Sequence, residues 1–298
     1  MRTTIEKLTG ASMSTLEDIK ANTNLYYISY KIRKANKKGF RYIDAPNDKL
    51  KLIQRNLVKN LFSKVKVADE AHGFTFKKSA VTNAQHHLGN NILLSIDIKD
   101  FFPSIQMNTI VKALVFAMLN SRIFLDRKDF KILISLVTYL GKLPQGAPTS
   151  PIISNICLFK LDEDLSSYFK EKEIVYTRYA DDITLSHKNK NISFIDDIIT
   201  IKQNLEKYDL KINKSKTKVL KRNKRMCVTG VVINDKLGTP RWYWRNLKAE
   251  MHNLIKRNEK INEKKWHELS GKITWVYTLN QNRGMQLRKL LSKIQLEN

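Results

Sequence analysis

Short runs of alternating apolar and polar residues predict a β-hairpin in the second half of the chain. The run from Ile174 to Tyr179 is rich in β-branched and aromatic residues, and the run from Ile183 to Ser186 alternates apolar with hydroxyl side chains. The first composition is typical of strands, and the alternation of the second run is typical of a half-buried strand. Because two adjacent aspartates, Asp181 and Asp182, lie between the runs, we expect them at the turn of the hairpin.

Other runs extend the strand prediction. Ile92 to Ile98 is nearly continuously apolar and carries Asp97 near its end, which predicts a buried strand. Between Leu25 and Ile43, aromatic and apolar residues alternate with basic ones around the turn-forming Asn36-Lys-Lys-Gly39, which predicts a basic hairpin. Two further strand-like segments are Leu210 to Leu220, and Met226 to Ile233 with an interruption at Thr229-Gly230.

Apolar residues spaced three and four positions apart predict amphipathic helices. These helices are expected over Leu50–Val65, Met107–Leu119, Lys131–Leu140, Ser154–Phe169 and Phe194–Tyr208. We expect Ser104 or Asn108 to cap the second of them. Residues 1 to about 20 should form a short polar helix or arm with Ser14 as its N-cap. The stretch from Ala71 to His87 is typical of a basic loop.

The charge makes a polyanion the leading partner. The 298 residues carry a formal charge of +26, far more than solubility requires. An anionic membrane would also attract this charge, but the sequence has no apolar run of 18 residues, so nucleic acid is favoured. Residues 241–298 hold 13 Lys or Arg against 5 Asp or Glu, together with all four tryptophans. Basic helices interleaved with aromatic residues suit a nucleic-acid backbone, although each Trp alone is typical of a core residue.

Cysteine usage and the N-terminus add two expectations. Cys157 and Cys227 each lie in an apolar run, which favours reduced core residues over a disulfide framework or a zinc site. The first ten residues lack the apolar segment of a signal peptide, so a cytoplasmic location is expected.

The aspartates allow two interpretations. Asp is common at exposed turns, and an isolated Asp-Asp pair fits such a turn. Adjacent carboxylates also repel each other, however, and favour a hard divalent cation, while an ionised Asp97 ending a buried strand is costly unless it is paired or metal-bound. A third element, the proline-rich loop Leu143–Pro151 with Gln145, lies between them in the sequence. Nucleotidyl transfer needs such a set, because carboxylates from separate strands must hold two Mg²⁺ ions roughly 3.5–4 Å apart.

With these elements in order, the sequence resembles the reverse transcriptases. Their three palm motifs are similar to Ser95-Ile-Asp-Ile-Lys-Asp-Phe-Phe-Pro-Ser104, Leu143-Pro-Gln-Gly-Ala-Pro-Thr-Ser-Pro151 and Tyr179-Ala-Asp-Asp182, and their following lysine motif and primer-grip strand are similar to Asn213-Lys-Ser-Lys-Thr217 and Met226–Ile233. Within the family the chain most resembles the bacterial retron enzymes. Asn83-Ala-Gln-His-His87 matches their Asn-Ala-x-x-His element, and Val228-Thr-Gly230 matches their Val-Thr-Gly element.

The resemblance implies an α+β right-hand polymerase fold with fingers, a palm of antiparallel sheet plus helices, and a helical thumb. The implied regions are an N-terminal helix or arm at 1–24, fingers at 25–90, a palm at 91–235 with finger-supporting helices at about 105–142, and a basic helical thumb at 236–298.

It also implies roles for individual residues. Asp97, Asp181 and Asp182 would form the catalytic triad and bind two Mg²⁺ ions, with Mn²⁺ as a substitute and the Ile98 carbonyl as a further ligand. The other implied roles are Lys216 as the general acid for pyrophosphate departure, Lys38 and Arg41 as triphosphate contacts, Phe102 as the steric gate against a ribonucleotide 2′-hydroxyl, Gln145 beside the incoming nucleotide, and Asn83, His87, Val228, Thr229 and Gly230 as RNA or primer contacts. From charge alone, Lys38 and Arg41 fit a solvated face equally well.

The partners implied by the resemblance are dNTPs and a cognate structured non-coding RNA. A guanosine 2′-hydroxyl in that RNA would start the DNA chain, giving the branched RNA–DNA product called msDNA. The family further implies an anti-phage defence role with a toxin or effector protein. Two alternatives stay open: a reverse transcriptase of a group II intron or another bacterial lineage, and an RNA-binding scaffold whose polymerase is vestigial.

Overall fold

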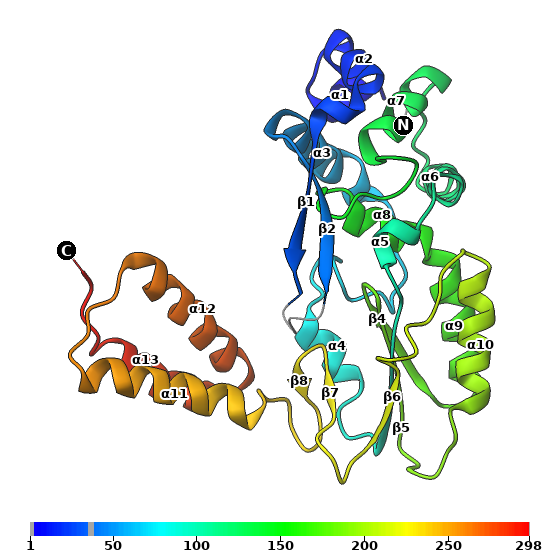
Figure 1. Cartoon of the computed structure of the whole chain (residues 1–298). Helices are drawn as coiled ribbons and strands as arrows, with labels where there is room; N and C mark the ends of the chain where they lie inside the picture. The colour runs from blue at the N-terminus through cyan, green and yellow to red at the C-terminus, as the bar shows by residue number, and fades with distance from the viewer. Residues whose placement is uncertain (1–2, 35–38, 298) are drawn as a thin grey trace. The chain divides into compact units, whose positions relative to one another are not determined.

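The computed structural model combines antiparallel strands with helices (Figure 1) and describes residues 3–34 and 39–297. The helices are α1 (Ile5–Thr9), α2 (Met13–Ala21), α3 (Asp48–Asn60), α4 (Ala80–His86), α5 (Phe101–Ser104), α6 (Met107–Asn120), α7 (Arg127–Val137), α8 (Ser150–Cys157), α9 (Phe159–Glu171), α10 (Ile195–Glu206), α11 (Arg241–Lys256), α12 (Glu263–Leu279) and α13 (Gln281–Leu291), with 3-10 turns η1 (Thr23–Tyr26) and η2 (Phe62–Lys64). The strands are β1 (Tyr27–Arg33), β2 (Phe40–Pro46), β3 (Ile92–Asp97), β4 (Val175–Tyr179), β5 (Asp182–His187), β6 (Lys218–Lys221), β7 (Cys227–Val228) and β8 (Val231–Val232).

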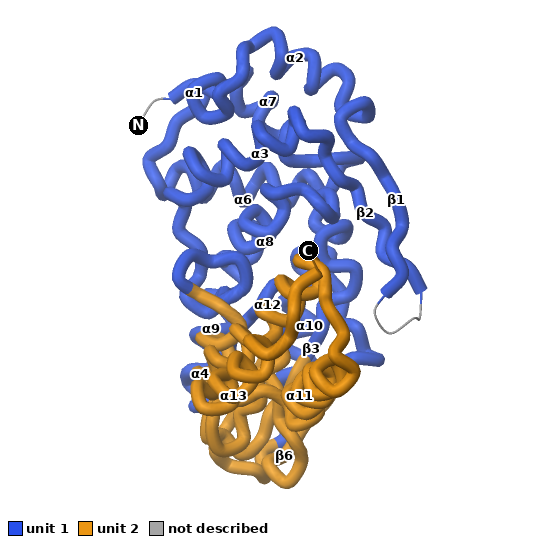
Figure 2. The backbone as a smooth tube through the Cα atoms, turned by 90° about the vertical axis from the view of Figure 1, so that its left-hand side faces the viewer, with its two compact units in different colours: residues 1–77, 96–183, 193–217 blue, residues 78–95, 184–192, 218–298 orange. Residues whose placement is uncertain are grey.

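The chain divides into two compact units (Figure 2). Unit 1 comprises residues 1–77, 96–183 and 193–217, and unit 2 comprises residues 78–95, 184–192 and 218–298. The boundaries cut strands β3 and β5. Asp97, at the end of β3, therefore belongs to unit 1, whereas the beginning of the same strand belongs to unit 2.

The central sheet has four strands in the order β4-β5-β3-β6. Strand β6 pairs antiparallel with β3, with Ile92 opposite Lys221 and Ser95 opposite Lys218. Because β3 lies between two other strands, five of its six residues are buried. This explains why β3 reads as a continuous apolar run and not as an alternating one.

In unit 1 the N-terminal helices and the predicted hairpin are fixed by long-range hydrogen bonds. The buried Asp129 carboxylate on α7 accepts the Ile5 N–H at 2.9 Å. The buried Gln54 amide on α3 donates to the Leu136 carbonyl at 2.8 Å and to the Tyr27 hydroxyl at 2.9 Å. Strands β1 and β2 form the predicted antiparallel hairpin, from Tyr27 opposite Pro46 to Arg33 opposite Phe40.

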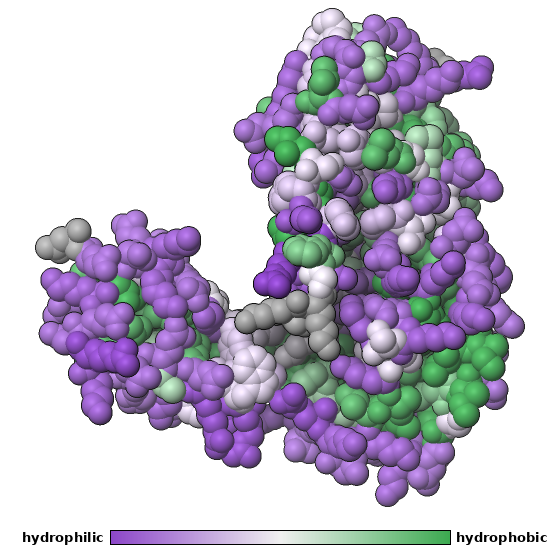
Figure 3. Space-filling view, in the orientation of Figure 1, coloured by the Kyte–Doolittle hydropathy of each residue, from purple (hydrophilic) through white to green (hydrophobic). Residues whose placement is uncertain are grey.

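Unit 2 contains two small cores. The first joins α4 to the β7–β8 hairpin and consists of Ala84, Leu93, Met226, Val228, Val231 and Ile233, with Trp275 packed against it. The second lies among α11, α12 and α13 and has Leu247, Met251, Leu269, Ile273, Val276 and Leu287 at its centre. The visible surface of these three helices is mostly hydrophilic (Figure 3). Trp244 and Trp266 pack against the second core and Trp275 packs against the first, whereas Trp242 is 55% exposed.

Several predicted helix ends are wrong for local reasons. The N-cap of α2 is Ser12 and not Ser14, and α6 begins after Gln106 without a side-chain cap. The helix expected from Ser154 begins at Ser150, where Pro151 favours a first turn, and it breaks at Leu158 into α8 and α9. The expected loop from Ala71 to His87 contains α4, whose N-cap Ser79 forms a capping box with Thr82.

The strand expected from Leu210 to Leu220 is much shorter, because only Lys218–Lys221 pairs as β6. The chain turns at Asn213, whose carbonyl accepts the N–H groups of Lys216 at 3.1 Å and Thr217 at 3.2 Å. Cys227 is only partly buried, unlike Cys157.

Replacing Gly284 with Ala should destabilise the pairing of α12 with α13. A Cβ at this position would lie 2.4 Å from the Cα and Cβ of Tyr277, and overpacking typically costs about 1–3 kcal/mol. Thermal unfolding of Gly284→Ala should therefore have a lower midpoint than that of the wild type. Gly271→Ala in α12 is the control, because no atom lies within 4 Å of its added Cβ. An unchanged midpoint for Gly284→Ala would contradict the packing.

Candidate active site

Asp97 is held at the end of β3 by groups from the segment that follows α10. Asp97 is only 7% exposed. Its main-chain carbonyl accepts the Asn213 N–H at 2.8 Å, and its side-chain Oδ1 accepts a hydrogen bond from the Asn213 side-chain amide at 2.8 Å. The Lys216 ammonium donates to Oδ2 at 2.6 Å. A buried carboxylate needs such partners, so this segment both orients Asp97 and supplies a countercharge.

Hairpin β4–β5 turns at Ala180 and Asp181, and Asp182 is the first residue of β5, so the turn expected between the two strands is confirmed. The Asp181 carbonyl accepts the Ile98 N–H at 2.8 Å, so the turn is joined by its backbone to the residue that follows Asp97. Burial raises the pKa of the Asp181 carboxyl, and the nearby Asp97 charge raises it further, against the opposing effects of Lys216 and Arg41. The Asp97 charge is thus near enough to act on the Asp181 carboxyl.

Lys216 balances part of this negative charge. Its hydrogen bond to Asp97 raises the pKa of the ammonium, and the charges of Asp97, Asp181 and Asp182 act in the same direction. The Lys216 side chain is 57% exposed, so the ammonium is cationic at neutral pH and can be reached from solvent.

The donor set fits a hard divalent cation. Carboxylate and backbone carbonyl oxygens are the ligands that such ions prefer, and the residues predicted to supply them, Asp97, Ile98, Asp181 and Asp182, all belong to unit 1. Among residues 3–34 and 39–297, however, no three acidic, histidine or cysteine side chains are arranged as a complete metal centre. Asp97 and Asp181 therefore form the nucleus of a candidate site.

A backbone contact joins the loop of Gln145 to the strand that carries Arg41. The Gln145 carbonyl accepts the Asp44 N–H of β2 at 2.9 Å. Gly146, with φ of +135°, lies so close to β2 that an added Cβ would approach the Ile43 side chain to 3.0 Å. This contact places Gln145 beside the strand that carries Arg41, and Arg41 is near enough to lower the pKa of Asp181.

Of the other two residues predicted to contact the nucleotide, Phe102 and Lys38, the structure describes only Phe102. Phe102 lies on α5 and is half-buried, with its ring 5.2 Å from that of Phe101. Lys38 lies outside the described residues.

The predicted RNA-contacting residues belong to unit 2, and several of them are inside it. Asn83 and His87 are fully buried, and His87 Nδ1 shares a hydrogen bond of 2.7 Å with the Ser186 hydroxyl. Neither polar atom of the Asn83 amide has a hydrogen-bond partner among the described residues. Because both side chains lack exposed surface, they cannot touch RNA directly in this conformation.

The Val-Thr-Gly element forms the turn of the β7–β8 hairpin. Val228 is buried in the core beside α4, whereas Gly230 is exposed. Thr229 has φ of +47°, a conformation that is unfavourable for a β-branched residue, and its hydroxyl donates to the Ala80 carbonyl at 3.0 Å. The two predicted motifs, at 83–87 and 228–230, are therefore parts of one packed assembly.

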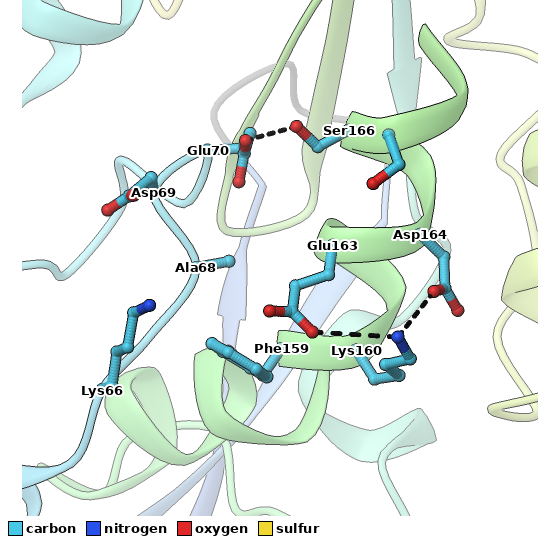
Figure 4. A pocket seen from close by; sticks show the side chains of 10 residues that line it. Lys66, Ala68, Asp69, Glu70, Phe159, Lys160, Glu163, Asp164 and Ser166 are labelled. Carbon is cyan, nitrogen blue, oxygen red and sulfur yellow. Dashed lines mark hydrogen bonds and ion pairs between the residues drawn. The ribbon is translucent and has the colours of Figure 1, made fainter. Parts of the chain in front are cut away.

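A cavity of about 390 Å³ beside α9 contains none of the predicted site residues. Four of its lining residues are acidic: Asp69, Glu70, Glu163 and Asp164. Figure 4 shows the Ser166 hydroxyl directed at Glu70 and the Lys160 ammonium between Glu163 and Asp164. Because neighbouring side chains partly neutralise these acidic charges, the cavity is not favoured over the surroundings of Asp97 as a candidate active site.

Neither a role for Asn213 nor a buried ion pair between Arg178 and Asp162 was predicted from the sequence. Both Arg178 and Asp162 are fully buried. The sequence contains two signals of such a pair. One is an acidic residue, Asp162, on the apolar face of α9 beside Leu161, Leu165 and Phe169, and the other is an arginine, Arg178, inside a strand.

Residues 32–233, more than half of the chain, match the family described as reverse transcriptase (RNA-dependent DNA polymerase). The chain belongs to the reverse transcriptase family. Two similar relatives are retron reverse transcriptases: Ec86 of Escherichia coli, 32% identical over 84% of this chain and 77% of the relative, and Mx65 of Myxococcus xanthus, 30% identical over 89% and 64%. The predicted resemblance to retron enzymes and the activity of an RNA-directed DNA polymerase are confirmed.

The fold of this reverse transcriptase has a counterpart among solved structures. The apo telomerase of Candida tropicalis aligns with a TM-score of 0.52 at 12% identity, over 91% of this chain and 58% of the telomerase. The predicted α+β polymerase fold is thereby confirmed. None of the helices in the described ranges has the length and apolar character needed to cross a membrane.

Asp181→Asn should stabilise the reverse transcriptase at neutral pH while abolishing its activity. A raised pKa means that ionising Asp181 costs folding free energy; the cost is full above the folded-state pKa and is absent below the unfolded value, about pH 4. In metal-free buffer at pH 7.5, we expect the variant's unfolding midpoint to rise by roughly 1–3 °C, with the gain shrinking as the pH falls.

Asp196→Asn, which alters an exposed carboxyl on α10, is the control and should change little. A lower midpoint for Asp181→Asn at pH 7.5 would show that the Asp181 charge is not destabilising.

Proposed function

We propose that the protein is the reverse transcriptase of a retron, which copies its cognate structured non-coding RNA into branched msDNA. The observation that carries the proposal is the junction of two strand ends. The Ile98 N–H donates to the Asp181 carbonyl, and the pKa of the Asp181 carboxyl is raised by burial and further by the nearby Asp97 charge. The motifs in the retron-like assembly of α4 and β7–β8 favour a retron over another lineage.

In the proposed mechanism, Asp97, Asp181, Asp182 and the Ile98 carbonyl hold two Mg²⁺ ions, for which Mn²⁺ can substitute. Such a pair of ions, when bound, activates the primer hydroxyl and stabilises the leaving pyrophosphate. Asn213 keeps the Asp97 carboxylate oriented through its hydrogen bond. Lys216 is the proposed proton donor to the departing pyrophosphate, since its ammonium is protonated at neutral pH and a positioned acid can serve this step.

The proposed nucleotide site uses Arg41 and Lys38 against the triphosphate and Gln145 beside the base and sugar. Phe102 is the proposed gate, because an aromatic ring at the sugar leaves no room for a 2′-hydroxyl. The contact between Gln145 and Asp44 supports this grouping, since it holds the loop and the Arg41-bearing strand together.

The proposed RNA contact is the exposed turn at Thr229-Gly230. Asn83, His87 and Val228 would act from within, by packing α4 against this turn. Folded RNA is read through its backbone, 2′-hydroxyls and exposed bases, and a hairpin turn with an exposed glycine lets a backbone approach closely.

The region boundaries are proposed as expected from the sequence: an arm at 1–24, fingers at 25–90, a palm at 91–235 and a thumb at 236–298. We also propose that the protein acts in the cytoplasm, where RNA and dNTPs are available, and that it serves anti-phage defence with an effector protein.

The direct test is to purify the protein from cells that carry its native neighbouring DNA and to treat the bound nucleic acid with DNase, RNase and debranching enzyme. We expect a branched RNA–DNA molecule with the wild type and none with an Asp181→Ala, Asp182→Ala variant. RNA without attached DNA in both samples would favour a scaffold or another reverse-transcriptase lineage.

Phe102→Ala should weaken discrimination against ribonucleotides by roughly 10-fold or more, because removing the ring opens space at the 2′ position. The measurement is kcat/KM for a dNTP and the matching rNTP in primer extension on an RNA template. Phe102→Tyr keeps the ring and should retain discrimination. Unchanged sugar selectivity in Phe102→Ala would remove this residue as the gate.

A further inference from the structure

We propose that Arg178 is a positioning residue for the catalytic Asp181, acting from a buried network with Asp162 and Asn155. This inference rests on the proposed function, because it concerns how the same carboxylate is aimed. Arg178 does not reach the exposed side of the turn, since its side chain is 0% exposed. Its influence must therefore pass through the backbone.

The guanidinium of Arg178 is held in a fixed orientation. Its Nε donates to Asp162 Oδ1 at 2.8 Å and its Nη2 donates to Asp162 Oδ2 at 2.6 Å. This is the bidentate fork that arginine forms with a carboxylate. The Tyr176 hydroxyl also donates to Asp162 Oδ1, at 2.6 Å. Strand β4 is thereby fastened to α9 without using the third guanidinium nitrogen.

That third nitrogen holds the turn. Nη1 of Arg178 donates to the Ala180 carbonyl at 3.0 Å and to Asn155 Oδ1 at 3.1 Å. The Ala180 carbonyl belongs to the peptide group that precedes Asp181. The peptide group that follows Asp181 is held by its own carbonyl, which accepts the Ile98 N–H. Both peptide groups flanking the catalytic aspartate are thus fixed, one by Arg178 and the other by the strand end next to Asp97.

The turn needs this support because its conformation is unfavourable. Ala180 has φ of +54°, a left-handed conformation that costs a non-glycine residue free energy and persists only where the surroundings impose it. Gly73 closes the opposite side, since an added Cβ would lie 2.7 Å from the Ala180 nitrogen. Asn155 connects the two sides by donating to the Gly73 carbonyl at 2.7 Å.

Two variants separate positioning from stability. Arg178→Met alone leaves the Asp162 charge buried and unpaired, which should lower the unfolding midpoint strongly. In Arg178→Met with Asp162→Leu, an apolar pair replaces the ion pair, and such replacements often preserve stability. The Tyr176 hydroxyl loses its acceptor in this variant, so recovery of stability is incomplete. The Ala180 carbonyl nevertheless loses its donor in both variants.

We expect the double variant to recover most of the lost stability while kcat in RNA-templated extension stays roughly 10- to 100-fold below wild type, as for a catalytic group misplaced by about 1 Å. KM for the dNTP and for the template-primer should change less than threefold. Amide hydrogen exchange of a peptide spanning residues 176–185 should be faster than in wild type.

Arg178→Lys covers the case in which the double variant does not fold. A single ammonium cannot form the fork with Asp162 and reach Ala180 at the same time, so kcat should fall by 10-fold or more although the charge is kept. Asp197→Asn is the control for lost stability. It removes the ion pair between the buried Asp197 and Lys172, 2.8 Å apart, and should lower the unfolding midpoint with kcat within twofold of wild type.

Wild-type kcat in the double variant, or in Arg178→Lys, would overturn the inference and leave the network with a structural role only. Absence of RNA-templated DNA synthesis by the wild type would instead contradict the proposed function. The two failures are therefore distinguishable in one set of assays.

Discussion

The cost of ionising Asp181 in a partly buried place beside Asp97 is the constraint on which this part of the structure depends. Burial is the main cause of the raised pKa of Asp181, and the charge of Asp97 adds to it, so the ionised carboxylates destabilise the folded chain. The surrounding groups offset it in two ways. Lys216 and Asn213 bind the Asp97 carboxylate directly, and the backbone bond from Ile98 to Asp181 holds the two strand ends together. A site of this kind gives up stability in order to bind positive charge, which is what a divalent-metal polymerase requires.

Catalytic and RNA-related motifs are separated in the fold. The aspartates, Lys216, Arg41, Phe102 and Gln145 all belong to unit 1, while the motifs at 83–87 and 228–230 belong to unit 2. In unit 2, two motifs that are about 140 positions apart in the sequence share one apolar core. Because Asn83 and His87 are buried, they lie in the interior, on the element that packs against an exposed turn. The residues proposed for the chemistry thus belong to one compact unit, and the two elements that resemble the retron family belong to the other.

Much of the site follows from local patterns in the sequence. The strand-like runs on either side of Asp181 predict the hairpin, and the apolar run ending at Asp97 predicts the buried strand; both elements are present because these patterns are local. The half-buried strand expected from the alternation between Ile183 and Ser186 is wrong, since all four of these residues are buried in β5. The strand expected from Leu210 to Leu220 is wrong over most of its length, since the carbonyl of Asn213 accepts two backbone N–H groups in a turn that alternation does not reveal. The Arg178–Asp162 pair and the contact of Gln145 with β2 could not be predicted, because they join residues whose proximity depends on the tertiary fold. An aspartate on the apolar face of α9 showed that a buried partner was needed but not which residue supplies it.

The central claim is that the junction of Asp97 and Asp181 creates a site for divalent cations. Titration of the protein with Mn²⁺, followed by electron paramagnetic resonance at pH 7.5, tests it most directly. The account predicts that Mn²⁺ affinity falls at least about 10-fold in Asp97→Asn and in Asp181→Asn, and that Glu163→Gln, a change in the acidic cavity beside α9, leaves it unaltered. Wild-type affinity in both aspartate variants would contradict the account.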